Sequence, residues 1–143
     1  MDTLALRFSD NFAPQEGTIQ IHKNLISQNG FVWYGKLGAP ISAKTASIIM
    51  NNEIPKILLI HSGRQNRYWA YVQEIKWDVP ETSMFPPYYE EKLESFKTWF
   101  RITKIENAGK DVMARCQVKS SGAMLSEASK KSMSPFFVIS YKE

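Results

Sequence analysis

Aromatic side chains gather in three segments, and their type and spacing suggest a pocket for a flat ligand. The segments are residues 31–36, residues 68–71 and the long run from 77 to 100. The first two have the pattern of strands, in which a ring on one face is easily spared from the core. The third contains a loop, where rings are costly to leave in water. Together with a basic charge balance, such rings point to a flipped or single-stranded nucleobase.

The basic residues favour an anionic partner. The 143 residues carry a formal net charge of +4 and a pI of about 9.2, which gives mild support for nucleic acid. A polar turn contains Arg64 and Arg67, and we predict that it clamps phosphates with help from Lys36, Lys44 and Lys76. The alternative is an ordinary solvated turn.

No residues are spaced for catalysis, so we expect a binding module rather than an enzyme. His22 falls on a predicted helix and His61 at a strand end, and the sequence fixes no acid or nucleophile beside either. Cys116 has no CxxC partner, so neither a disulfide framework nor a zinc site is predicted. The phosphate-binding patterns GxxxxGKS/T and GxGxxG are missing. We therefore predict no cofactor and no metal.

The compartment follows from equally simple features. A single cysteine agrees with a reducing environment. The first residues lack a basic stretch followed by a long apolar run, and no apolar run approaches membrane-spanning length. We expect a cytoplasmic protein without a membrane partner.

Alternating apolar residues predict a chain dominated by short strands. Strand patterns cover residues 3–8, 31–37, 56–61, 68–76, 96–106, 112–118 and 136–141. Helix patterns cover 18–29 and 42–51, opened by Thr18 and Ser42, and shorter helical turns are expected from Pro87 and over 125–130. Residues 56–61 and 68–76 should form a hairpin, and 112–118 should pair with 96–106.

This order of elements predicts an α+β fold. Regular helices between the later strands are missing, which argues against a doubly wound parallel sheet. We expect a curled, partly open β-barrel of about six to seven strands with two or three helices packed outside. Residues 1–143 should form a single domain, since one core suffices for this length.

From about Gly30 onward, the order of features resembles a known superfamily. A Trp lies near the start of the second strand (residues 31–34), a helix follows, and a strand–turn–strand unit covers 57–62 and 68–72. A proline-rich aromatic loop, the pair Trp99–Phe100 and the segments 121–125 and 132–134 complete the order. The chain resembles the PUA-like superfamily, in its EVE and YTH branch.

The resemblance implies an open barrel whose mouth accepts a modified base in a cage of aromatic rings. It makes Trp33, beside Tyr34, the first wall of the cage. The second wall should come from the loop after the hairpin, and its candidates are Trp77, Phe85, Tyr88 and Tyr89. The loop departs from the YTH pattern, because it is built around Pro80, Pro86 and Pro87 without one clearly matching Trp. The identity of the base therefore stays open.

The function that the resemblance implies is recognition of a modified base in DNA, above all a methylated one, by base flipping. By the same resemblance, the chain would be the specificity domain of a modification-dependent restriction system, fused to or assembled with an NTPase or nuclease. Two alternatives stay open. One is a PUA-like or YTH-like protein that reads methylated or structured RNA. The other is an interaction or small-molecule-binding domain in which the aromatic residues, including Trp69 and Trp99, are core.

Overall fold

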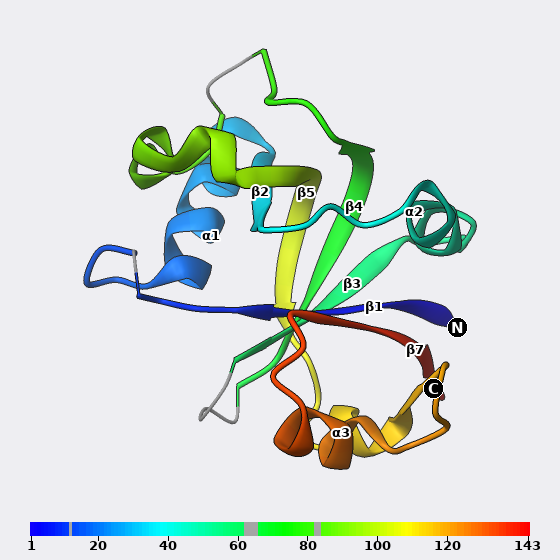
Figure 1. Cartoon of the computed structure of the whole chain (residues 1–143). Helices are drawn as coiled ribbons and strands as arrows, with labels where there is room; N and C mark the ends of the chain where they lie inside the picture. The colour runs from blue at the N-terminus through cyan, green and yellow to red at the C-terminus, as the bar shows by residue number, and fades with distance from the viewer. Residues whose placement is uncertain (12, 62–65, 82–83) are drawn as a thin grey trace.

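Seven strands form one sheet in the computed structural model, which describes residues 1–11, 13–61, 66–81 and 84–143 (Figure 1). The strands are β1 Asp2–Phe8, β2 Val32–Leu37, β3 Lys56–His61, β4 Tyr68–Lys76, β5 Phe96–Asn107, β6 Cys116–Val118 and β7 Phe136–Tyr141. The helices are α1 Thr18–Asn29, α2 Ala43–Met50 and α3 Leu125–Lys131, with 3₁₀ segments η1 Pro87–Ser95 and η2 Val112–Arg115. The predicted α+β class is confirmed.

The strand order is β2-β5-β4-β3-β1-β7-β6. β1 and β3 run parallel, and the other neighbouring strands are antiparallel, including the predicted hairpin of β3 and β4. The sheet curls strongly, because side chains from β1 and from β2, four places apart in the order, pack in the same cluster. The barrel is therefore open along a seam between β1 and β2, which share this cluster without pairing in the sheet.

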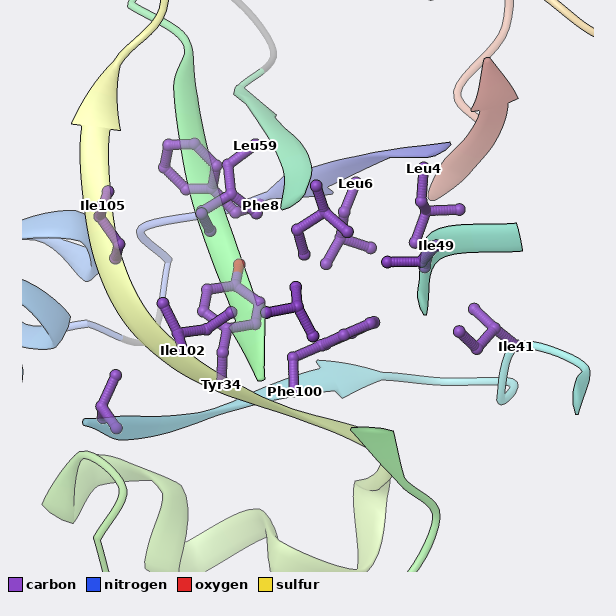
Figure 2. Packing of buried hydrophobic residues seen from close by; sticks show 14 of the residues in the cluster. Leu4, Leu6, Phe8, Tyr34, Ile41, Ile49, Leu59, Phe100, Ile102 and Ile105 are labelled. Atoms are coloured by element: carbon purple, nitrogen blue, oxygen red, sulfur yellow. The ribbon is translucent and has the colours of Figure 1, made fainter. Parts of the chain in front are cut away.

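The barrel interior is filled by the inward residues of five strands. Figure 2 shows Leu4 and Leu6 from β1 beside Ile49 from α2, with Tyr34 and Phe100 approaching from the other side of the barrel. The near-continuous apolar pattern of β3 predicts burial on both faces, and this is confirmed. Leu59 lies in the interior cluster, whereas Leu58 lies in a second cluster on the outer face, beneath η2 and α3.

The first two helices begin and end where local chemistry dictates. Ser42 accepts a hydrogen bond from the backbone N–H of Thr45 at 3.1 Å, as a helix-capping serine should. Gly30 ends α1 in the left-handed conformation, with φ of 86°. Thr18 differs from its predicted capping role, because Gly17 takes the cap position and Asp10 accepts the Thr18 N–H at 2.9 Å.

The region 112–118 differs from prediction in two ways. Only Cys116–Val118 is a strand, and it pairs with β7 rather than with β5. The preceding residues form η2, in which Val112 and Ala114 donate backbone hydrogen bonds to Gly109 and Asp111. These local bonds outcompete a strand in spite of the alternating apolar pattern.

Candidate functional site

A cavity of about 170 Å³ opens at the seam of the barrel. Its walls come from β1, the start of α1, β2, η1 and the start of β5. Five aromatic residues line it together with Leu6, Leu37 and Pro135; they are Phe8, Tyr34, Tyr88, Tyr89 and Phe96. Arg7 and Lys92 add basic side chains to the lining. The cavity is thus an aromatic slot with polar groups at its edge.

Tyr34 is the aromatic side chain from β2 that lines this slot. Residues of a strand point alternately to opposite faces, and Figure 2 shows the Tyr34 ring reaching from β2 into the barrel interior. Burial raises the pKa of the Tyr34 phenol far above its ordinary value. Tyr88 is half-buried, and burial also raises its pKa. Both phenols are therefore neutral at physiological pH and can donate or accept a hydrogen bond.

A buried hydrogen-bond chain fixes the wall formed by η1. The Tyr89 hydroxyl donates to His22 Nε2 at 2.9 Å and accepts from the Gly35 N–H at 3.2 Å. His22 Nδ1 lies 2.7 Å from the Thr18 carbonyl oxygen, which can only accept, so the imidazole carries its proton on Nδ1. Burial lowers the pKa of His22 to about 4. One neutral histidine thus links α1, β2 and η1.

Close packing explains why β2 has a glycine at the slot. A Cβ on Gly35 would lie 2.5 Å from the nearest ring carbon of Phe96. That ring is stacked on Tyr89 at a centroid distance of 4.3 Å, so it has little room to move away. Gly35 therefore lets β5 and η1 approach β2 closely enough to form the slot.

The start of α1 forms the remaining edge of the cavity. Thr18 Oγ1 donates to the Ser9 carbonyl at 3.0 Å. Asp10, which accepts the Thr18 N–H, has its other carboxylate oxygen 3.6 Å from His61 Nε2. The sequence alone indicates no partner for His61. This contact ties the end of β3 to the start of α1, rather than forming a nucleophilic site.

A family model described as Pua-like matches residues 4–134. The chain belongs to the Pua-like family. Domains of this kind are typically binding modules, with nucleic acids as common partners. Neither a curated protein nor a solved structure matches the chain. No described helix is both long and apolar enough to cross a membrane, and among the described residues no three His, Cys, Asp or Glu side chains gather to hold a metal ion.

In this Pua-like chain the predicted aromatic residues separate into three places. Tyr34, Tyr88 and Tyr89 meet at the cavity. Trp33 and Phe85 instead lie in a closed cluster around Trp99, where Trp33 is only 4% exposed. Lys76 covers the Trp33 ring with its ammonium 5.5 Å from the ring centroid. The geometry therefore gives Trp33 no open face for a base.

Trp77 has a different position again. It is 42% exposed, and its indole N–H donates to the Ile41 carbonyl at 2.9 Å. Thr98 Oγ1 accepts the Ile41 N–H at 3.1 Å, so both backbone groups of Ile41 are held ahead of α2. Trp77 thus anchors a turn and does not line the cavity.

The predicted phosphate-binding residues are also dispersed. Lys36 is 3% exposed, its ammonium donates to the carbonyls of Leu37 and Ala39, and burial lowers its pKa. Those bonds leave it poorly placed for a phosphate. Lys44 is exposed on α2. Arg64 lies outside the described residues, and Arg67 lines a separate hollow.

Sequence reasoning missed several residues of the cavity, namely Phe8, Thr18, Lys92 and Phe96. Lys92 and Phe96 follow Tyr88 closely in the chain, so the aromatic loop could have been extended to them. Phe8 and Thr18 had no such signal, because only the curl of the sheet brings β1 to β2.

Proposed function

We propose that this Pua-like chain is a non-enzymatic module that binds a modified base, most simply a methylated base of DNA, flipped into the cavity at the seam. The cavity itself is the observation that carries the proposal. Its volume of about 170 Å³ is of the same order as the roughly 150 Å³ apolar cavity that holds a benzene ring. It thus suits one planar ring entering from outside.

The cavity walls supply what a flipped base needs. Stacking on an aromatic ring contributes roughly 1–3 kcal/mol per base, and unstacking the base costs a few kcal/mol. We infer that Tyr34 and Tyr88 provide the stacking surfaces and that Tyr89 holds them in place. Trp33 and Phe85 pack in one cluster with Tyr89, whereas Trp77 lies away from the cavity. The neutral phenols can donate a hydrogen bond to the edge of an uncharged base or accept one from it.

The pocket would prefer a methylated base over the unmodified one because binding buries the methyl group. Each buried methyl carbon contributes about 0.8 kcal/mol, and more if the unmodified base leaves the slot partly empty. We infer that the domain acts as the specificity part of a modification-dependent restriction system, fused to or assembled with an NTPase or nuclease. Modest affinity from a single pocket would suit such a multimeric assembly.

The test compares two aromatic substitutions in a fluorescence titration. The probes are paired short single-stranded DNAs that differ only in one N6-methyladenine or one 5-methylcytosine, and matching RNAs form a second series. We expect Tyr88→Ala to weaken binding of the preferred modified DNA by about 5- to 150-fold and to reduce its preference over the unmodified strand. The control, Trp77→Ala, should keep both the affinity for the modified DNA and the preference over the unmodified strand.

Equal affinity for every modified and unmodified pair would refute the reader function. A preference that survives Tyr88→Ala but is lost in Trp77→Ala would move the pocket away from the seam. Stronger discrimination within the RNA series would replace DNA by RNA as the ligand.

A further inference from the structure

A second hollow gathers basic residues from three separate segments. It measures about 560 Å³ and lies between α1, the start of β4 and the turn after β5. Lys23, Arg67 and Lys110 bring three positive charges to its lining, and Glu16 brings one negative charge. Three amide side chains add neutral donors: Gln20, Asn66 and Asn107. The lining is thus rich in groups that donate hydrogen bonds to an anion.

Regular structure holds these basic residues in place. The Arg67 carbonyl accepts a hydrogen bond from Ala108 at 2.8 Å, directly beside the paired residues Tyr68 and Asn107. The Lys23 ammonium lies 5.7 Å from the centroid of the Tyr68 ring. Arg67 and Lys23 are therefore carried by backbone that is already ordered, which reduces the entropy lost when a ligand binds.

The hollow is a direct neighbour of the seam cavity. Thr18 lines the cavity, and the next residue, Ile19, lines the hollow. The ring of Phe8, in the cavity wall, contacts that of Tyr68, in the hollow, at a centroid distance of 6.4 Å. The first turn of α1 is thus a shared partition between an aromatic slot and a basic hollow.

We propose that the hollow binds backbone phosphates of the same nucleic-acid strand whose base enters the cavity, one phosphate to each of its three cations. The inference rests on the proposed function and adds a site of different chemistry to it. Phosphate oxygens accept from both charged and amide donors, which are the groups gathered here. Lys23 and Lys110 join Arg67 in this role, whereas Lys36 and Lys76 are turned toward carbonyls and the Trp33 ring.

The test uses two triple variants with the same change in net charge. The hollow variant carries Lys23→Gln, Arg67→Gln and Lys110→Gln. The control variant carries Lys97→Gln, Lys130→Gln and Lys131→Gln, at exposed positions outside both the cavity and the hollow. Binding of a fluorescein-labelled single-stranded DNA with one modified base is measured over a range of salt concentrations, together with its unmodified twin.

Losing three phosphate contacts should flatten the slope of log K against log salt by about 2, since each contact on a single strand contributes about 0.7. If the variant and the wild type bind equally at 1 M salt, this change in slope lowers the binding constant at about 0.1 M salt on the order of a hundredfold. The control variant should keep a slope close to that of the wild type. Lys110→Gln alone, at an exposed position, should flatten the slope by about 0.7 even if the triple variant folds poorly.

The outcomes separate the two proposals. A hollow variant whose slope is flatter than that of the control variant, with the preference for the modified strand kept, supports both proposals. Equal slopes in the hollow and control variants, with the preference intact, overturn the phosphate site alone. Loss of salt dependence in a protein with no preference for any modified strand keeps the hollow as a phosphate site and overturns the reader function.

Discussion

His22 should make the stability of the protein depend on pH between about 4 and 6.5. The imidazole is completely buried, its Nε2 accepts from Tyr89, and burial lowers its pKa from 6.5 to about 4. Protonation would place a second donor opposite a Tyr89 hydroxyl whose oxygen already accepts from Gly35. The charged form would therefore be desolvated, and the present hydrogen bond from Tyr89 to Nε2 would be lost.

Proton binding to His22 sets both the direction and the size of the change in stability with pH. Between about pH 4 and pH 6.5 the unfolded chain binds a proton at His22 and the folded chain does not, so stability falls as the pH is lowered through this range. Each unit of pKa difference is worth about 1.4 kcal/mol. Going from pH 7 to pH 5 should remove about 2 kcal/mol through His22, and the full effect below about pH 4 is on the order of 3 kcal/mol.

Urea unfolding followed by tryptophan fluorescence at pH 7 and pH 5 measures this contribution. The comparison is between wild type, His22→Gln and the control His61→Gln, because carboxylates also contribute to the pH dependence. We expect the loss between the two pH values to be about 2 kcal/mol smaller in His22→Gln than in the other two proteins. Parallel pH profiles for wild type and His22→Gln would refute the buried neutral histidine.

Two further substitutions test the packing around the cavity. Gly35→Ala should cost about 1–3 kcal/mol of stability through overpacking against Phe96, which thermal unfolding would register as a lower Tm, and an unchanged Tm would mean that η1 and β5 can move apart freely. Trp33→Ala should cost about 3–5 kcal/mol, because it empties a buried site; a fold of unchanged stability by circular dichroism and urea titration would instead favour Trp33 as a dispensable ring of the pocket.

Most of the secondary structure could be predicted because its signals are local. Ser42 caps α2, and Gly30 closes α1. The apolar run of β3 indicates burial on both faces. The strand expected over 112–118 was wrong in its first half, because alternation cannot reveal competing hydrogen bonds such as that from Val112 to Gly109. Its pairing with β7 depends on contacts distant in sequence.

The candidate site was harder to predict for a similar reason. Trp33 and Tyr34 are adjacent aromatic residues that must face opposite sides of β2, and the sequence does not say which side is the barrel interior. The resemblance to known readers favoured Trp33, whereas the curl of the sheet puts Tyr34 at the cavity. Lys23 and Lys110 were missed because they come from segments 87 positions apart in the chain.

The position of β1 between β3 and β7 has a consequence for how the protein folds. Ala5 pairs with Leu58, and Asp2 pairs with Ser140, so both edges of the first strand wait for residues made much later. To form such pairings, the chain must first lose the entropy of closing a large loop, and only then gains the strand contacts. Folding is therefore slow. Until β7 arrives, β1 presents a bare edge on which another nascent copy could pair. Chain length between partners, rather than any weakness of the finished core, should therefore limit the yield of native protein during refolding.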